Sequence, residues 1–416
     1  MSDFDSQLRQ RLATLREQGL YRELRRVDSA QGPRIVIGGR ALLNFSSNDY
    51  LGLANEPALR DAAVAAVQQF GAGAGASRLI CGSLAPHHEL DEALAAFKGT
   101  EAALSFSTGY AAALGTICAL LDKDDIIVLD KLVHASIVDA ARLSGAKLRV
   151  FAHNDLNDLE AILKWAGEVQ SLKSKVQSPS RSPHVLVVTE SIFSMDGDQA
   201  PLRELVELKE RFGAWLMVDE AHATGLFGAH RRGLAEASGV AGRIEVQMGT
   251  LGKALGAAGG YICGSRPLID YLVNRARSFI FSTAPVPAAA AAATAGVRLV
   301  QSALGEERRS RLWQRAAAVT LGGATFLSPQ APVCGDEDVA APTAPPSAIL
   351  PLIVGDETKA LAAATRLREL GLFIPAIRYP TVARGTTRLR LTITAAHTPE
   401  DIAELCAALK TLDIGL

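Results

Sequence analysis

The chain has 416 residues, of which 43 are basic and 44 acidic, so its formal net charge is −1. This length favours a large domain plus a smaller one over a single core. A balanced charge, without a basic run interleaved with aromatic residues, argues against a nucleic acid partner. The five cysteines show no CxxC spacing, which favours a reducing compartment and predicts neither a disulfide framework nor a metal site.

The N-terminal part offers a helix and then a glycine-rich segment. Residues 1–20 predict a charged amphipathic helix and not a secretion signal, so we expect a cytoplasmic protein. The glycines of residues 71–83 follow a helical pattern, whereas a dinucleotide fingerprint follows a strand. We therefore reject a dinucleotide site there. A loop facing the substrate and a plain structural turn both remain open.

Short apolar runs alternate with helical patterns through the middle of the chain, which predicts an α/β fold. The runs are apolar almost throughout and so suit a mostly parallel sheet with helices on both faces and room for an antiparallel strand. Ligands of such sheets gather at the carboxyl ends of the strands. The predicted strands span residues 124–130, 147–151, 184–190, 214–220, 244–248 and 259–264.

Residues 284–297 are dominated by alanine and fall short of the roughly 20 strongly apolar residues of a membrane helix, so we expect a buried helix and no membrane association. Two polar stretches, 171–183 and 327–347, predict exposed loops. Strand and helix patterns after the second stretch predict a small α+β domain. We divide the chain into an N-terminal helix and segment (1–50), a large domain (51–290) and a small domain (291–416).

Lys253 and Asp219 carry the strongest chemical signal. Lys253 lies among small residues in TLGKALGAAGG, directly after an apolar run, which makes an ordinary surface lysine the less favoured interpretation. A neutral lysine amine can condense with an aldehyde, and glycines let a ligand approach closely. Asp219 ends an apolar strand, where a carboxylate can hold the ring nitrogen of pyridoxal phosphate protonated. The pair predicts a pyridoxal phosphate site.

Gly109 and Tyr110 stand at a predicted helix start, where exposed amides and the helix dipole suit a phosphate. A core helix capped by Ser107 or Thr108 is an equally good interpretation. His134 follows a strand and opens a helix, so its ring can stack on a flat cofactor or cap the helix.

His222, three residues after Asp219, can bond to the phenolic oxygen of the cofactor. Its DExH string also suggests a metal site or a helicase. We find no convincing set of further metal ligands and no Walker A loop, so we reject both.

With these motifs in place, the chain resembles the α-oxoamine synthases, pyridoxal phosphate enzymes with the aspartate aminotransferase fold (fold type I). The likeness rests on the strings NFSSNDYLGL at 44–53, DEAHATGLFG at 219–228, TLGKALGAAG at 250–259 and RLRLTITAAHT at 388–398. It implies a large domain with a mostly parallel seven-stranded sheet and a smaller α+β C-terminal domain.

The resemblance also implies roles for individual residues around the cofactor. Lys253 is similar to the Schiff-base lysine and proton-transfer base, Asp219 to the partner of the pyridine nitrogen, and His134 to the ring-stacking histidine. The implied contacts of the phenolic oxygen are Ser191 and His222, those of the phosphate are Gly109, Tyr110 and Thr250, and those lent by a neighbouring subunit are Ser282 and Thr283.

Arg390, with Asn48 nearby, is similar to the arginine that binds the substrate carboxylate, and Thr381 and Arg22 resemble contacts of the acyl substrate. A small shift in alignment would select Arg25 or Arg26 instead of Arg22. The resemblance implies L-alanine and a pimeloyl thioester as substrates and a homodimer with its active site at the subunit interface. Other members of the family, an ordinary aminotransferase and a noncatalytic partner subunit are the alternatives, and the last is disfavoured because Lys253 is present.

Overall fold

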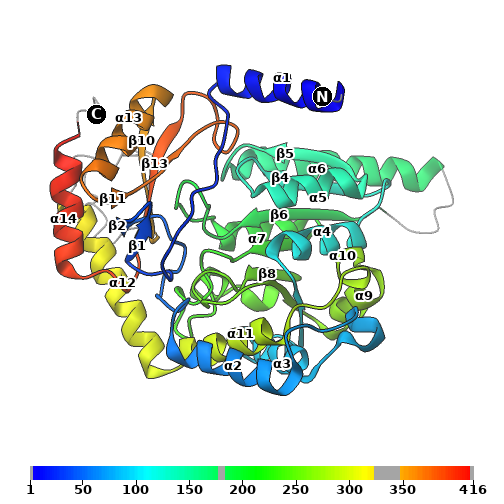
Figure 1. Ribbon diagram of the computed structural model, residues 1–416. Coiled ribbons are helices and arrows are strands. Elements are labelled where there is room, and N and C mark those ends of the chain that lie inside the picture. Colours follow the sequence, from blue (N-terminus) through cyan, green and yellow to red (C-terminus); the bar gives the residue numbers. More distant parts are fainter. Residues whose placement is uncertain (1–2, 177–182, 323–346, 413–416) are drawn as a thin grey trace.

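The computed structural model describes residues 3–176, 183–322 and 347–412. A seven-stranded sheet crosses the larger part of the molecule, and two small sheets lie beside it, near the C-terminal helices (Figure 1). The strand order of the large sheet is β3-β9-β8-β7-β6-β4-β5, and β9 runs in the opposite direction to the other strands of this sheet. The predicted α/β sheet with one antiparallel member is therefore confirmed.

The strands of the large sheet are short and mostly buried. They are β3 (Ala102–Phe106), β4 (Ile126–Asp130), β5 (Lys147–Phe151), β6 (Val185–Glu190), β7 (Trp215–Asp219), β8 (Val246–Thr250) and β9 (Gly260–Gly264). Every residue of β3, β4, β6 and β9 is buried, as expected for strands covered on both faces. The sequence analysis did not predict β3.

Alternate residues of the strands belong to two separate cores, one on each face of the sheet. Ile127 and Leu129 pack on the side of α4 (Gly109–Leu120), α5 (Ala135–Ser144), α9 (Arg266–Arg275) and α10 (Arg277–Ile280). Ile126 and Val128 share the other core with α2 (Pro57–Phe70), α3 (Ala85–Lys98), α6 (Leu156–Val176), α7 (Leu202–Arg211) and α11 (Pro287–Gln301). The remaining short helices here are η1 (Arg78–Gly82), α8 (Leu234–Ala237) and η2 (Ala241–Arg243).

One of the two small sheets joins segments from both ends of the sequence, and the other holds C-terminal segments only. One consists of β1 (Arg34–Ile37), β2 (Arg40–Asn44) and β11 (Leu372–Phe373), and the other of β10 (Ile349–Gly355), β13 (Thr387–Thr392) and β12 (Ala376–Ile377). The helices α12 (Ala303–Gly322), α13 (Glu357–Glu369) and α14 (Pro399–Lys410) lie on this side, while α1 (Asp3–Glu17) has no buried residue (Figure 1).

Some sequence-based expectations need correction. Residues 171–176 continue helix α6 and are not loop, whereas 177–182 and nearly all of 327–347 lie outside the described residues. The pairing of β2 with β11 joins part of the segment 1–50 to the C-terminal region, and the predicted boundary at 290 falls inside α11. The division into domains stays a prediction. Within the described ranges, no helix is long and apolar enough to cross a membrane.

Candidate active site

Three neighbouring parallel strands deliver polar side chains to one edge of the large sheet. Glu190 ends β6 and pairs in register with Asp219, which ends β7. Asp219 in turn pairs with Met248 of β8, and Lys253 follows that strand in a tight turn. The carboxyl ends of parallel strands meet at a common edge, so residues more than sixty positions apart in sequence converge here.

The turn that carries Lys253 is fixed by close packing. Gly256 donates its amide to the carbonyl of Lys253 at 2.9 Å and has a φ of +69°, a conformation that L side chains rarely adopt. A Cβ at Gly256 would lie 2.4 Å from Cβ of Leu53, so only glycine lets this turn approach the 44–53 segment. The small residues around Lys253 thus serve close contact.

The Lys253 amine lies 2.7 Å from Nε2 of His222. Burial lowers the pKa of Lys253 to about 8, against the opposing charges of Asp219 and Glu190. Burial, together with the positive charges of Lys253, Arg390 and His134, holds the pKa of His222 well below its usual value. The lysine is therefore partly neutral near neutral pH, the form that attacks a carbonyl.

Tyr50 completes this chain of polar contacts, and the sequence analysis assigned it no role. Its hydroxyl lies 2.5 Å from Nδ1 of His222, and the side chain is fully buried. Burial raises the pKa of Tyr50 to about 12, so the hydroxyl keeps its proton. A protonated hydroxyl donates to Nδ1 and leaves the proton of the neutral ring on Nε2, which faces Lys253.

Asp219 and Glu190 form a pair of buried carboxyl groups whose pKa values are raised to different extents. Burial raises the pKa of Asp219, but Lys253, the amide of Ala221 at 2.9 Å and His134 act in the opposite direction. Burial and the neighbouring Asp219 raise the pKa of Glu190 well above its usual value. When two carboxyls share a site, the pKa of one rises more than that of the other, and here it is the pKa of Glu190.

His134 caps helix α5, one of the two interpretations that the sequence left open. Its Nδ1 accepts from the amide of Ser136 at 3.2 Å. Burial lowers the pKa of His134, and the nearby charges of Asp219 and Lys253 act on it in opposite directions. The hydroxyl of Ser191 donates to the backbone carbonyl of Asp219 at 3.3 Å.

The start of helix α4 and the end of β8 form a polar corner. Thr108 caps the helix by accepting from the amide of Ala111 at 3.0 Å, as one sequence interpretation predicted. The first amides of a helix have no acceptor within it. Thr250 Oγ1 is buried and has no hydrogen-bond partner among the described residues. Free donors at a helix start, with an unpaired hydroxyl beside them, suit a phosphate group.

Gly109 makes this corner possible, and its substitution is a sharp test. A Cβ on Gly109 would lie 2.6 Å from Cγ2 of Thr250, so Gly109→Ala must displace either the helix start or Thr250. We expect the dissociation constant of pyridoxal phosphate to rise by about tenfold or more in an absorbance titration. The control is Gly167→Ala on α6, where a Cβ meets open space. Equal affinity in both variants would exclude the corner as the phosphate site.

Arg390, on β13, lies near Lys253 and His222. It is 6% exposed; its Nε donates to the Ser194 carbonyl at 2.6 Å, and its Nη1 donates to Asn48 Oδ1 at 3.1 Å. Its charge lowers the pKa of both Lys253 and His222. A guanidinium fixed beside a reactive amine is suited to bind a carboxylate.

The other predicted contacts lie farther out. Arg22 donates to the hydroxyl of Thr381 at 3.4 Å, whereas Arg25 lies over the ring of Phe373 and Arg26 pairs with Asp28. The predicted acyl contacts Arg22 and Thr381 are thus brought together. Tyr110 is 47% exposed and bonds to Asp139. Ser282 precedes Thr283, which pairs with Ser77 in an isolated bridge.

These residues fit pyridoxal phosphate. The partly neutral, buried Lys253 would bond to the aldehyde, the buried Asp219 would pair with the ring nitrogen, and the corner with the unpaired Thr250 hydroxyl would hold the phosphate. The chain matches the class I and II aminotransferases over residues 40–409 and belongs to that family. The fold and the site thus define an enzyme that uses pyridoxal phosphate, as the sequence predicted.

Full-length relatives narrow the family to the α-oxoamine synthases. The 8-amino-7-oxononanoate synthase of Anaeromyxobacter sp. (strain K) is 48% identical over 398 residues, which cover 96% of this chain and 93% of that protein. The enzyme of the same name from Geobacter sulfurreducens is 46% identical, with 96% and 95% covered. The predicted family resemblance is therefore confirmed.

Solved structures agree on the fold. A serine palmitoyltransferase from S. paucimobilis, solved with bound pyridoxal phosphate–myriocin aldimine, has a TM-score of 0.86 at 30% identity, with 99% of this chain and 98% of that chain covered. An 8-amino-7-oxononanoate synthase from Francisella tularensis has a TM-score of 0.69 at 26% identity, with 89% and 96% covered.

Proposed function

We propose that the protein condenses L-alanine with a pimeloyl thioester, carried by coenzyme A or a carrier protein, with loss of carbon dioxide. The product would be 8-amino-7-oxononanoate, made for biotin synthesis. The convergence of Lys253, Asp219 and Arg390 in one buried cluster carries the proposal, because it supplies an amine, a ring partner and a carboxylate site together. Curated relatives that are 41–48% identical over nearly the whole chain carry that name, which supports the choice of reaction.

Pyridoxal phosphate, when bound, supplies an acceptor for the electron pair that a broken Cα bond leaves behind. Arg390 would hold the alanine carboxylate, and the Lys253 amine would take the Cα proton. Asp219 would keep its negative charge opposite the ring nitrogen, and His134 would lie against the ring. Cα then bonds to the acyl carbon, the thiol leaves, the Cα–carboxylate bond breaks to release carbon dioxide, and a proton returns to Cα.

The acyl group would enter past Arg22 and Thr381. These side chains form a hydrogen bond at 3.4 Å, and both are exposed, as an entrance for a bulky thioester requires. The positive charge of Arg22 suits a pimeloyl chain, which ends in a second carboxylate. An ordinary aminotransferase would need no such entrance.

A homodimer in the cytoplasm is part of the proposal. Leu79, Ile80 and Phe281 expose 48%, 79% and 69% of their surfaces. The Ser77–Thr283 bridge joins the segment that carries Leu79 and Ile80 to the segment that carries Phe281, so exposed apolar side chains stand on both segments next to Ser282 and Thr283. Such a surface supports an interface through which one subunit lends residues to the other. The four described cysteines are free, which fits a reducing compartment.

A substrate test separates the proposal from its alternatives. The purified protein with pyridoxal phosphate is mixed with L-alanine, glycine or L-serine, and then with pimeloyl-, acetyl- or succinyl-coenzyme A, while free thiol is followed. We expect thiol release only with L-alanine and the pimeloyl thioester. Release with glycine and acetyl- or succinyl-coenzyme A would instead indicate 2-amino-3-ketobutyrate ligase or 5-aminolevulinate synthase activity. Amino-group exchange without thiol release would indicate an aminotransferase.

A further inference from the structure

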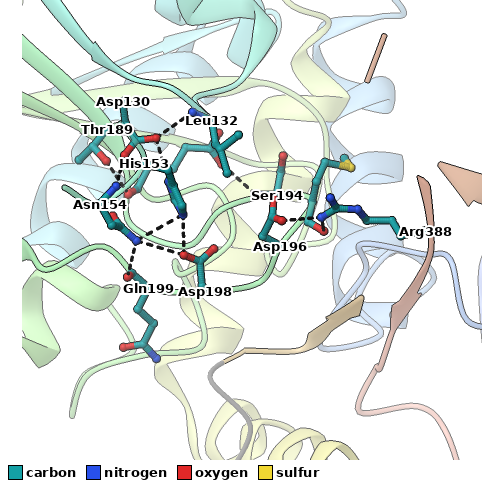
Figure 2. Close-up of polar contacts among 12 residues, drawn as sticks. Asp130, Leu132, His153, Asn154, Thr189, Ser194, Asp196, Asp198, Gln199 and Arg388 are labelled. Atoms are coloured by element: carbon teal, nitrogen blue, oxygen red, sulfur yellow. Dashed lines mark hydrogen bonds and ion pairs between the residues drawn. The ribbon is translucent and has the colours of Figure 1, made fainter. Parts of the chain in front are cut away.

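A histidine with two carboxylate partners lies beside the turn that contains Ser194 and Asp198 (Figure 2). His153, two residues after β5, places Nδ1 3.0 Å from Asp130 Oδ1 and Nε2 2.7 Å from Asp198 Oδ2. Asp130 ends β4 and is buried, while Asp198 lies in the turn that follows β6. None of these residues belongs to the cofactor or substrate contacts described above.

The geometry requires a charged ring. A carboxylate only accepts hydrogen bonds, so two carboxylate partners need a proton on each ring nitrogen. Burial alone would lower the pKa of His153, but the hydrogen bonds and charges of Asp130 and Asp198 outweigh burial and raise it to about 10. Hydrogen bonds between charged groups are the stronger kind, so the ring ties the end of β4 firmly to the turn.

The His153 ring contacts both ends of that turn, which spans residues 193–198. The Phe193 ring packs edge-on against His153 with centroids 4.3 Å apart. The turn closes on itself through the amide of Phe193, which donates to the Asp198 carbonyl at 3.1 Å, and the amide of Gly197, which donates to the Phe193 carbonyl at 2.8 Å. Asn154 adds a bond from Nδ2 to Asp198 at 3.1 Å. The position of the turn therefore depends on His153.

Two arginines of β13 reach the opposite side of the turn. Arg390 Nε donates to the Ser194 carbonyl at 2.6 Å, and Arg388 Nη1 donates to the Met195 carbonyl at 3.2 Å and to Asp196 (Figure 2 shows Arg388 and the turn). They stand two residues apart on one strand and therefore project from the same face. The Ser194 carbonyl in this turn therefore helps to fix the guanidinium of Arg390.

We propose that His153, bonded to Asp130 and Asp198, positions the Ser194 carbonyl and through it Arg390, and is thereby a positioning residue for the carboxylate of the amino acid substrate. The inference rests on the proposed role of Arg390. It predicts a selective loss, because the acyl contacts Arg22 and Thr381 lie outside the turn. Release of the turn weakens binding of the amino acid and leaves binding of the thioester unchanged.

The test compares His153→Ala, Asp198→Asn and wild type as holoenzymes. For His153→Ala we expect the KM of L-alanine, and its dissociation constant from the absorbance of the bound cofactor, to rise by about tenfold. The KM of pimeloyl-coenzyme A should stay within about twofold. His230→Ala is the matched control, since it removes an exposed histidine paired with Glu236 at 2.5 Å. Unchanged alanine binding, or an equal rise in both KM values, would overturn the proposal.

A second variant keeps the test decisive where His153→Ala does not fold. The Asp198 side chain is 39% exposed, and Asp198→Asn keeps its shape. The substitution removes the negative charge that Asp198 places beside the His153 ring. It should raise the alanine dissociation constant by about threefold, and no change would overturn the proposal. Where wild type itself releases no thiol from pimeloyl-coenzyme A, the proposed function fails separately. The absorbance titration then tests the same positioning with whichever amino acid, glycine or L-serine included, wild type binds.

Discussion

Replacement of Lys253 with alanine should reduce product formation by about a thousandfold or more, because it removes both the bonding amine and the base. With a pKa of about 8, roughly a quarter of the Lys253 amine is neutral at about pH 7.5. His222 Nε2 at 2.7 Å orients this amine. Steady-state thiol release measures the loss. Borohydride reduction followed by peptide mass spectrometry should label Lys253 in wild type and no peptide in the variant.

The control for Lys253→Ala is another buried lysine. Lys209, on helix α7, is 5% exposed and donates to Glu245 Oε1 at 2.5 Å, so Lys209→Ala also removes a buried ammonium. It removes the charged partner of Glu245, which keeps the hydrogen bond from the amide of Leu216 at 2.8 Å, and should lower the melting temperature while turnover persists. Turnover of Lys253→Ala above about a hundredth of the wild-type rate would show that Lys253 is not the essential amine and base.

The fold was predictable where the sequence carries strong β propensity. The six predicted strands match β4 to β9 because each is dominated by apolar residues, many of them β-branched, and has a turn or helix pattern at its ends. β3, with the sequence AALSF, contains no β-branched residue and went unpredicted. Its place comes from pairing along its whole length with β9, a long-range contact that a local pattern does not record.

The error at residues 171–176 has a local cause. Serine and lysine there suggested a loop, yet a helix begun at Leu156 gains one hydrogen bond for each residue that it adds. Leucine and lysine both have good helix propensity, so the polar composition did not end the helix. Composition alone does not separate an exposed helical turn from a loop.

In the candidate site, the sequence pointed to residues that end strands or stand in distinctive strings. Lys253, Asp219 and His222 were found in this way, and the structure brings them together. Tyr50 stood inside a quoted string without a role, and Glu190 ended a predicted strand. The contribution of Glu190 depends on which strands are neighbours, since burial and then Asp219 on the adjacent strand raise its pKa. Strand order is a property of the folded sheet.

Asp219→Asn should leave the cofactor bound and slow turnover by about a hundredfold to a thousandfold. The amide keeps the size of the side chain and can still accept the hydrogen bond from the amide of Ala221 at 2.9 Å. It carries no negative charge, so it cannot hold the ring nitrogen protonated, and removal of the Cα proton by Lys253 becomes slow. Exchange of the alanine Cα proton with deuterated solvent, followed by NMR without any thioester, measures this step directly.

The neighbouring carboxyl supplies the decisive comparison for Asp219→Asn. Glu190→Gln makes the same isosteric change at the residue paired in register with Asp219. Burial and the charge of Asp219 hold the pKa of Glu190 well above its usual value, so the substitution at Glu190 removes less negative charge than Asp219→Asn does. Glutamine can still accept from the amide of Ser194, which Glu190 Oε2 meets at 3.1 Å. We expect exchange within about threefold of wild type, and a loss as large as that of Asp219→Asn would show that Glu190 carries the charge.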